Sequence, residues 1–546
     1  MNILYIMFDQ LRFDYLGCAG HRSMRTPHLD RMAARSVRFT EAYTQSPICG
    51  AARMSAYTGR YVSSHGAQWN NVPLRVGEMT LGDHLRQGGT GCWLIGKTHM
   101  RADAAGMARL GLASDSVIGA RQAECGFDVW LRDDGLWAQG PGGFYDRKRS
   151  PYNEYLRSKG YDGQNPWADY ANAGVEGDEM ASGWFMANAR RPANIREEDS
   201  ETPWLTTQAM DFIDKTPGPW CAHLSYIKPH WPYIVPAPYH DLYGIEDIAP
   251  PNRAECERDT PHPVYAAFME GRIGRSFARD AVREAVIPAY MGLIAQCDDQ
   301  MGRLFGWLEE TGRMADTMII VTSDHGDYLG DHWMGEKDLF HEPSVKVPLI
   351  IHDPRAEADG ARGTTCDAMV EVIDIAATVI EASGGAVPEH IVEGRSLLPF
   401  LRGERPETWR DFAVSEYDYS RHPVAAGLGI APRDSRMVMV ADHAWKLIHC
   451  EGGLRPMLFD RVNDPNELHD LGDDPGYAAA RANMAEKLHH WSLRMAQRVT
   501  VSDADILAAR AGSNDTGVVL GVYEAEEVPP EEVAAYRGPV RQRFSE

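Results

Sequence analysis

The sequence lacks paired cysteine spacings, long apolar runs, internal repeats and any excess of basic residues. Its nine cysteines are scattered singly, with no CxxC spacing, which favours free thiols in a reducing cytoplasm. No stretch approaches the roughly 18 to 20 apolar residues that a membrane-spanning helix needs. The chain has 55 basic and 78 acidic residues, a formal charge of -23, which argues against nucleic acid or an anionic membrane as its main partner.

What the sequence contains is typical of a globular protein. Hydrophobic residues make up 44% and charged residues 24% of the 546 residues, and this length predicts a main domain with a smaller companion. The first residues lack the basic start and the cleavage site of a secretory signal, so we interpret Ile3 to Phe8 as a buried strand. The net charge still permits a small anionic ligand, provided that a local group of cationic side chains or a metal binds it.

Short β-rich apolar runs alternate with helical patterns, which predicts an α/β domain over residues 1–400, with a mostly parallel sheet between two layers of helices. Helices are expected from Pro27, with Thr26 as N-cap, to about Ser36, and over residues 285–311. Residues 101–200 have weak periodicity, and we expect long excursions over the ligand-binding face there. Strands are expected at residues 3–8, 220–226 and 317–322.

A smaller C-terminal subdomain is expected over residues 401–511. Residues 436–450 alternate as one half-exposed strand, a second run covers residues 456–460, and a helix is expected from about Gly476 to Gln497. These elements predict an antiparallel sheet closed by a helix. The acidic, proline-containing tail, 512–546, is expected to pack on a partner subunit, so we predict a homo-oligomer, either a dimer or a tetramer.

The most specific motif begins at Cys49 and runs CGAARMSAYTGR to Arg60. It resembles the signature of sulfatases, in which Cys, a variable residue, Pro, a variable residue and Arg are followed by Thr-Gly-Arg at this spacing. Ala51 departs from the usual Pro. Taken alone, Cys49 would be interpreted as a buried structural thiol, and the other residues of the motif favour a functional interpretation.

The resemblance implies an alkaline phosphatase-like fold and a covalent mechanism. In sulfatases a maturation enzyme oxidises this cysteine to formylglycine, so the resemblance implies formylglycine at Cys49 and that enzyme as a partner. A hydrated aldehyde suits the chemistry, because one hydroxyl attacks the ester and the other later expels the product by restoring the aldehyde. Arg53, one helical turn after Cys49, is expected to hold this group, and the helix N-terminus favours negative charge beside it.

Acidic residues at two expected strand ends predict a metal site. Asp9 ends the first strand, and Asp324 and His325 follow the strand over residues 317–322, so these side chains can meet at the carboxyl edge of one sheet. With Cys49 they would bind one divalent metal, either Ca²⁺, which suits oxygen ligands, or Mn²⁺, which the imidazole favours. Sulfatases commonly have a second Asp after the first and an Asn after the later one. Gln10 and His325 stand at those positions here, which resembles the phosphonate monoester hydrolase branch of the superfamily.

Residues 91–98 formally match the phosphate-binding loop of NTPases. We reject this match, because residues 92–95 are apolar and are expected to form a strand, whereas that loop needs a permissive backbone between its glycines. The same segment, continued by His99, resembles the Gly-Lys-Trp-His segment of sulfatases, whose Lys and His contact the sulfate oxygens and the nucleophile. The resemblance therefore implies that Lys97 binds the substrate and that Lys97 and His99 both take part in catalysis.

Two further segments are expected to serve the leaving group. His230 matches the family histidine that protonates the departing oxygen, and Lys337 matches the lysine that shares this work, so both are also expected to contact the substrate. Asp324 is expected to act as a base as well as a ligand. Asn70 resembles a substrate-contacting residue of the phosphonate hydrolases. Other polar residues are interpreted as structural: His65, Asp298 and Asp299.

These residues together predict a hydrolase that cleaves small anionic sulfate monoesters in the manner of an arylsulfatase. Sulfate and phosphonate monoesters are both tetrahedral monoanions, so promiscuity toward phosphonate monoesters and phosphodiesters is expected. Phosphonate monoester hydrolysis as the main activity is the alternative, because Lys97 and His99 favour sulfate whereas Gln10 and His325 favour phosphonate. An inactive binding protein on the same fold stays open as a different class of function.

Overall fold

The computed structural model describes residues 1–135, 150–494, 499–512, 526 and 530. Its contacts divide the chain into two compact units, the first with residues 1–387 and 392–495 and the second with residues 388–391 and 496–546. In the second unit the structure describes the helix α17 (Asp503–Gly512). The predicted tail, 512–546, falls almost entirely outside the described residues, so its contact with a partner subunit stays a prediction.

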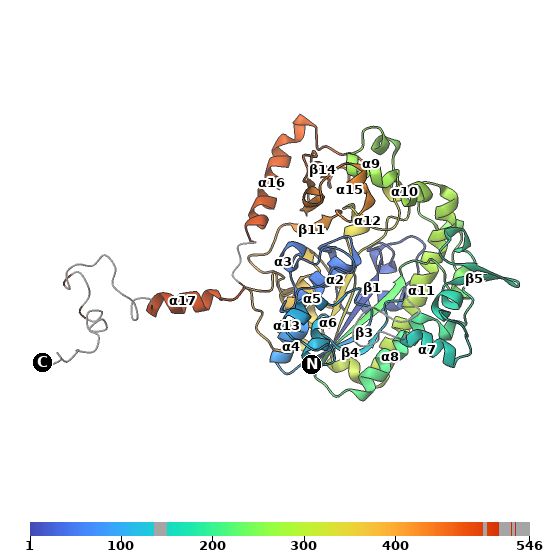
Figure 1. Cartoon of the computed structure of the whole chain (residues 1–546), viewed down its shortest axis with the longest axis horizontal. Coiled ribbons are helices and arrows are strands. Elements are labelled where there is room, and N and C mark those ends of the chain that lie inside the picture. The colour runs from blue at the N-terminus through green and yellow to red at the C-terminus, as the bar shows by residue number, and fades with distance from the viewer. Residues whose placement is uncertain (136–149, 495–498, 513–525, 527–529, 531–546) are drawn as a thin grey trace. The chain divides into compact units, whose positions relative to one another are not determined.

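An eight-stranded sheet forms the centre of the first unit (Figure 1). Its strands, in spatial order, are β10 (Thr364–Glu371), β2 (Val37–Tyr43), β9 (Leu349–His352), β8 (Thr317–Ser323), β1 (Asn2–Asp9), β7 (Trp220–Pro229), β3 (Gly91–Gly96) and β4 (Asp128–Arg132). All neighbouring pairs are parallel except the two that involve β9. The predicted α/β class with a mostly parallel sheet is confirmed.

The central strands β1 and β8 are apolar along most of their length because both of their faces are covered. Residues 3–9 of β1 and all residues of β8 are buried, and such strands lose the alternation of polar and apolar residues. β1 lies between β8 and β7, with Met7 opposite Thr322 on one side and Ser225 on the other. The carboxyl end of β1 therefore lies beside those of two neighbours.

Helices cover both faces of this sheet, and each layer has its own apolar core (Figure 1). One layer consists of α1 (Pro27–Ala33), α7 (Pro151–Ser158), α8 (Glu201–Lys215), α10 (Arg272–Phe277) and α11 (Asp280–Glu310). The other consists of α2 (Cys49–Thr58), α4 (Leu81–Gln87), α13 (Asp374–Ala382) and α14 (Leu398–Leu401). None of the helices that the structure describes has both the length and the apolar character to cross a membrane.

The predicted antiparallel sheet follows in the same compact unit, with strands β11 (Ala413–Asp418), β12 (Arg436–Ala441), β13 (Trp445–Cys450) and β14 (Met457–Asp460). One face packs against α16 (Ala478–Leu493), and the other against α9 (Pro263–Met269), α12 (Glu342–Val345) and α15 (Pro423–Gly427). The single strand predicted over residues 436–450 was wrong. Asp442 Oδ1 accepts hydrogen bonds from the Ala444 and Trp445 N–H groups and closes a turn between β12 and β13. The predicted boundary at residue 400 stays a prediction.

Residues 101–200 contain more regular structure than predicted, although residues 136–149 lie outside the described part. They include α5 (Ala104–Arg109), α6 (Val117–Ala123), β4, α7 and a hairpin of β5 (Ala173–Glu176) and β6 (Glu179–Ser182). β4 is an edge strand of the large sheet and pairs only with β3 among the described strands. Its sequence, DVWLR, is short, charged at both ends and mostly half-buried, so it lacks the apolar run that identified β1.

Candidate active site

Four parallel strands end at one edge of the large sheet, and a predicted site residue stands at each end. Asp9 is the last residue of β1 and Asp324 follows β8, while His230 follows β7 and Lys97 follows β3. These strands are neighbours in the order β8-β1-β7-β3. Because parallel strands present their carboxyl ends along one edge, residues that are far apart in the sequence meet there.

Cys49 reaches this edge from the N-terminus of α2, which follows β2. Every residue of α2 is buried, and Ile48 at the N-cap position offers no side-chain acceptor. Asn70 takes that role, since its Oδ1 accepts a hydrogen bond from the Gly50 N–H at 2.8 Å. The helix ends at Gly59, whose φ of 67° is the left-handed conformation that glycine adopts readily. Asn70 thus caps the helix next to Cys49, and its substrate contact stays a prediction.

The four predicted metal ligands, Asp9, Cys49, Asp324 and His325, are brought together by the fold. One ligand atom of each lies within 4.8 Å of the others, and all four side chains are inaccessible to solvent. The Cys49 Sγ lies 3.0 Å from His325 Nε2 and 3.7 Å from Asp9 Oδ1. His325 Nδ1 lies 2.8 Å from the carbonyl oxygen of the following glycine, which keeps a proton on Nδ1 and turns Nε2 into the cluster.

This cluster fits a divalent cation. Although burial lowers it, the charges of Asp324 and Cys49 raise the pKa of His325 to about 9. Once His325 Nε2 has lost its proton, this imidazole and the two carboxylates form a donor set suited to Mn²⁺ or Ca²⁺. Gln10 lies beside the cluster: its backbone N–H donates to Asp324 Oδ1 at 3.1 Å and its Nε2 donates to Tyr233 and Asp327, whereas its buried Oε1 has no hydrogen-bond partner among the described residues. The sequence marked Gln10 only as a departure from the sulfatase pattern, and the structure makes it a candidate member of the site.

Arg53 holds the two carboxylates of the cluster in place. Its Nε donates to Asp324 Oδ2 at 2.8 Å and its Nη2 to Asp9 Oδ2 at 3.0 Å. Its Nη1 donates to Ser225 Oγ at 2.6 Å, a contact that no sequence pattern indicated. The Cys49 Sγ is not among its hydrogen-bond partners in the described part of the chain. The rigid fork of the buried guanidinium therefore positions the acids, and its predicted hold on residue 49 itself stays a prediction.

Lysine and histidine side chains surround the cluster. Lys337 Nζ donates to the Cys49 Sγ at 2.9 Å and lies 3.1 Å from His230 Nε2. His230 Nδ1 lies 2.8 Å from the Trp231 carbonyl oxygen, so Nδ1 carries the ring proton and Nε2 accepts a hydrogen bond from Lys337. Lys97 Nζ lies 2.5 Å from Asp9 Oδ2. A lysine–histidine pair thus lies on the cysteine side and a second lysine on the carboxylate side.

These charges shift the pKa values of the buried groups. Burial raises the pKa of the Cys49 thiol, but Lys337 and His325 outweigh this effect and hold it well below its ordinary value. Burial, with the positive charge of Lys337, lowers the pKa of His230 to about 3. Burial and the neighbouring charge of Asp9 raise the pKa of Asp324. The surroundings of residue 49 therefore favour an anion there.

His99 is the predicted catalytic residue that the fold does not bring into contact with the cluster. Its backbone N–H donates to Asp134 Oδ1 at 3.3 Å, and its φ is 56°. Its Nδ1 is buried and has no hydrogen-bond partner among the described residues. Within that part of the chain, no hydrogen bond or ion pair joins its ring to Cys49 or Lys97. The catalytic role of His99 stays a prediction.

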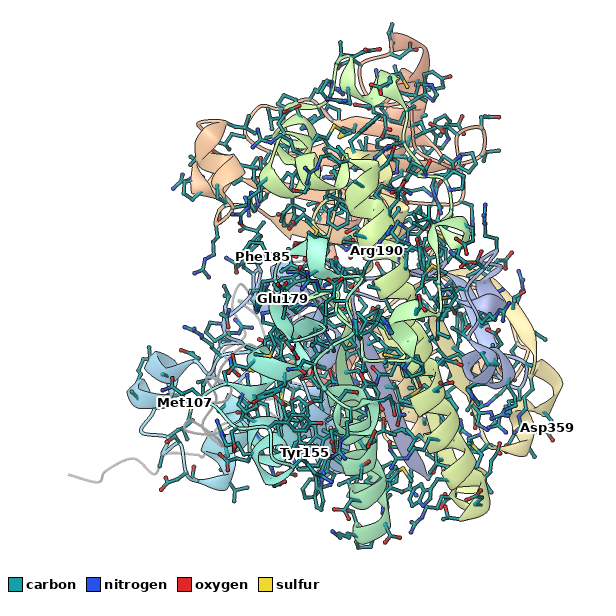
Figure 2. All side chains as sticks on the ribbon, turned by 90° about the vertical axis from the view of Figure 1, so that its right-hand side faces the viewer. Met107, Tyr155, Glu179, Phe185, Arg190 and Asp359 are labelled. Atoms are coloured by element: carbon teal, nitrogen blue, oxygen red, sulfur yellow. The ribbon has the colours of Figure 1, made fainter. Side chains whose placement is uncertain are left out.

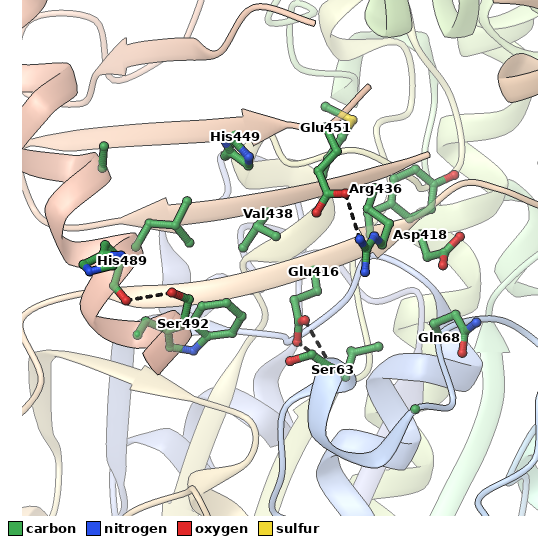
Figure 3. A pocket seen from close by; sticks show the side chains of 17 residues that line it. Ser63, Gln68, Glu416, Asp418, Arg436, Val438, His449, Glu451, His489 and Ser492 are labelled. Atoms are coloured by element: carbon green, nitrogen blue, oxygen red, sulfur yellow. Dashed lines mark hydrogen bonds and ion pairs between the residues drawn. The ribbon is translucent and has the colours of Figure 1, made fainter. Parts of the chain in front are cut away.

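Several cavities lie near the small sheet in the described part of the chain, and two of them bear on the site. The first, of about 640 Å³, lies between α3 (Val62–His65), the small sheet and α16 (Figure 3). Its polar side chains pair with one another, as Ser63 N–H donates to Glu416 Oε2 at 3.0 Å and Arg436 pairs with Glu451 at 2.8 Å. It contains none of the predicted site residues. The second, of about 700 Å³, has Lys337 in its wall.

Comparisons with known proteins agree on one family. The family model described as sulfatase matches residues 1–385, and the one described as N-sulphoglucosamine sulphohydrolase, C-terminal, matches residues 330–494. The chain is 31% identical over 532 residues to the multifunctional alkaline phosphatase superfamily protein PehA of Trinickia caryophylli, a match that covers 91% of this chain and 96% of that protein. It is 28% identical to an arylsulfatase of Clostridium perfringens, covering 87% of this chain and 91% of that protein.

The solved structure of a phosphonate monoester hydrolase of Agrobacterium radiobacter superposes with a TM-score of 0.77 at 28% identity, covering 90% of this chain and 96% of that one. The phosphonate monoester hydrolase SpPMH of Silicibacter pomeroyi also gives a TM-score of 0.77, at 28% identity and with 91% and 96% covered. The sulfatase match includes the whole large sheet and every residue of the cluster from Asp9 to Lys337. The chain therefore belongs to the sulfatase family.

Proposed function

We propose that this hydrolase cleaves sulfate monoesters, aryl sulfates among them, and accepts phosphonate monoesters and phosphodiesters as secondary substrates. The observation that carries the proposal is the convergence of Cys49 with Asp9, Asp324 and His325 at one buried point, next to Lys337. A nucleophile position beside metal ligands and a proton donor is what displacement at a tetrahedral monoanion requires.

Formylglycine at Cys49 and one divalent metal, Ca²⁺ or Mn²⁺, complete the proposed site. Asp9, Asp324 and His325 would hold the metal, together with the modified residue 49. When present, hydrated formylglycine supplies the attacking hydroxyl, and the metal supplies positive charge for the ester oxygens. The position of Cys49 supports this proposal, because an oxygen there would meet Lys337 and His325, the two groups within 3.0 Å of the sulfur among the described residues.

The protein's own residues prepare the attack. Arg53 fixes both carboxylates, which leaves Asp324 in a defined orientation to accept the proton of the attacking group. Asp324 Oδ1 also accepts hydrogen bonds from the Gln10 and His325 N–H groups at 3.1 and 2.9 Å. Lys97 neutralises the non-bridging oxygens of the ester, and His99 assists the release of the product.

Lys337 and His230 act on the leaving group. In the neutral His230 ring the proton is on Nδ1, which donates it in a hydrogen bond to the Trp231 carbonyl, so Nε2 has no proton to donate. The proton for the departing oxygen therefore comes from Lys337 Nζ, either directly or through His230 Nε2, which lies 3.1 Å away. Lys337 is thus the source of the proton, and His230 either relays that proton or holds the Lys337 ammonium group in position.

Phosphonate monoester hydrolysis as the main activity is the second candidate. The observation that favours it is the position of His325 Nε2 inside the cluster, with Gln10 next to it, since these two residues carry the resemblance to the phosphonate hydrolases. The two phosphonate monoester hydrolase structures support the same candidate. Three further predictions from the sequence stay predictions: a maturation enzyme as partner, a dimer or tetramer, and a cytoplasmic location.

The test uses one preparation and two substrates. Turnover of an aryl sulfate and of the matching aryl phosphonate is measured side by side, and mass spectrometry reports the fraction of Cys49 converted to formylglycine. Higher kcat/KM for the sulfate is the expected result, and higher kcat/KM for the phosphonate selects the second candidate. Full activity of Cys49→Ala on both esters would remove the proposal, and a native protein that is converted at Cys49 yet inert would identify a binding protein.

A further inference from the structure

Aromatic rings lead from the leaving-group histidine to the protein surface. The His230 ring lies 4.3 Å from the Trp231 ring, measured between centroids, and the Trp231 ring lies 5.4 Å from that of Trp184. Trp231 is half-buried, whereas Trp184 is 48% exposed. A large indole open to water at the end of such a series is unusual, because aromatic side chains normally bury most of their surface. We call the pair Trp231 and Trp184 the indole ledge.

The ledge is held firmly in place. Trp184 follows the β5–β6 hairpin, and the preceding Gly183 packs so closely that an added Cβ would lie 2.4 Å from the Asn172 carbonyl oxygen. Lys228 Nζ donates to Asn172 Oδ1 at 3.0 Å and to the Pro232 carbonyl at 2.9 Å. This buried lysine, together with the hydrogen bond from the Gly183 N–H to the Asn172 carbonyl at 2.9 Å, therefore ties the segment that carries Trp231 to the segment that carries Trp184.

We propose that the indole ledge binds the organic part of the leaving group, and that the substrates of this enzyme are esters of phenols or of other extended apolar alcohols. The inference rests on the proposed function, because it takes His230 as the residue nearest the departing oxygen. An ester oxygen at His230 Nε2 puts the carbon attached to it within reach of the Trp231 face. Aromatic rings stack at centroid distances of about 4.5–7 Å, so a ring bonded to that oxygen is close enough to stack on the ledge.

The ledge separates substrates by the size of their apolar group. A methyl ester ends before it reaches Trp184, a phenyl ester covers Trp231, and a two-ring naphthyl ester extends along both indoles. Removal of the Trp184 ring should therefore lower kcat/KM most for the naphthyl ester, since only that substrate contacts both indoles. A single lost aromatic contact with its buried surface corresponds to about a ten-fold change in affinity for the transition state.

The experiment compares kcat/KM of methyl, phenyl and naphthyl esters of one reacting acid, each expressed relative to the wild-type enzyme so that intrinsic reactivity cancels. Trp184→Ala is expected to lower the naphthyl value about ten-fold more than the methyl value. The matched control is Phe185→Ala, on the same segment. Phe185, labelled in Figure 2, is 69% exposed and makes no ring contact with the ledge among the described residues. This variant should leave the ratio of the two values unchanged.

Three results would overturn the ledge. An equal loss for all three esters in Trp184→Ala would show that the indole does not distinguish leaving groups. A selective loss in Phe268→Ala, in the wall of the 700 Å³ cavity beside Lys337, would place the leaving group there instead. A changed subunit number by light scattering in Trp184→Ala, with unchanged ester ratios, would assign the exposed indole to a contact between copies of the chain. Failure of the proposed function itself looks different, because no ester would then be turned over in a Cys49-dependent way.

Discussion

Replacing Lys337 by methionine removes the one cation in the described part of the chain that contacts both the nucleophile position and the leaving-group histidine. Its Nζ lies 2.9 Å from the Cys49 Sγ and 3.1 Å from His230 Nε2, and the residue is buried. Methionine keeps most of the length of the side chain and loses the charge and the protons. His230 would then have no proton on Nε2, since the Trp231 carbonyl holds the ring proton on Nδ1.

The size of the effect follows from the leaving group. A general acid contributes about 10²–10⁴ in rate, equivalent to about 3–5 kcal/mol of barrier. A departing phenol of high pKa needs that proton, whereas a nitrophenolate leaves well without it. We therefore expect Lys337→Met to lower kcat about 10³-fold for a phenyl ester and only about 10-fold for a 4-nitrophenyl ester.

The assay measures kcat for a series of aryl esters with leaving groups of graded pKa, and the variant should show a steeper dependence on that pKa. Because Lys337 also contacts Cys49, each rate is divided by the fraction of formylglycine found by mass spectrometry. Lys215→Met is the matched control, as this lysine is 60% exposed and pairs with Asp211 on the surface. Equal losses across the series would refute the reasoning and would mean that Lys337 acts on the nucleophile or on the ester oxygens.

Metal removal, a buried ion pair and the cap of α2 give further predictions. Dialysis against a chelator should abolish turnover and Mn²⁺ or Ca²⁺ should restore it, whereas undiminished activity in protein shown to be metal-free by elemental analysis would contradict the proposed site. Arg410→Met should lower the Tm by leaving two buried carboxylates of β10 and α13 unpaired, at a cost of about 3–5 kcal/mol. Arg405→Met is the matched control, because Arg405 forms an exposed ion pair with Asp367. Equal Tm values of the two variants in calorimetry would refute the prediction. Asn70→Ala should lower both the Tm and kcat/KM, whereas Asn70→Asp should keep the Tm, because it retains the oxygen that accepts from Gly50, and still lose kcat/KM.

The strands that carry the site could be predicted because the pattern that identifies each one lies within its own short stretch of sequence. β1 and β8 are buried on both faces, so residues 3–8 and 318–321 form uninterrupted apolar runs, and the acidic residues at or just after the ends of these strands stand out. The edge strand β4 could not be predicted in the same way, since one neighbour and partial exposure leave it no such run. Recognition of Cys49 depended on a motif, and no periodicity would have found it.

The hydrogen-bond partners that position the site residues could not be predicted from the sequence, because they depend on strand register and on the paths of loops. Ser225 meets Arg53 only because β7 pairs with β1 in the register that puts Ser225 opposite Met7. Asn70 caps α2 because the chain after that helix returns to its first turn. Neither contact leaves a pattern of spacing or hydropathy.

The two oxygens of Asp9 contact different groups of the site, and this arrangement limits how Lys97 can bind a substrate. Oδ2 accepts from Arg53 at 3.0 Å and pairs with Lys97 at 2.5 Å, whereas Oδ1 lies 3.7 Å from the Cys49 Sγ and 3.8 Å from His325 Nε2. Oδ1 is therefore the oxygen of Asp9 that would hold a metal. Lys97 already forms an ion pair with Asp9 Oδ2. It can therefore bind an ester oxygen only by donating to both the ester and Asp9, or by breaking its contact with Asp9. A metal on Oδ1 would withdraw charge from the whole carboxylate and weaken the hold of Asp9 on Lys97. Metal binding and substrate binding would thus be coupled through a single side chain.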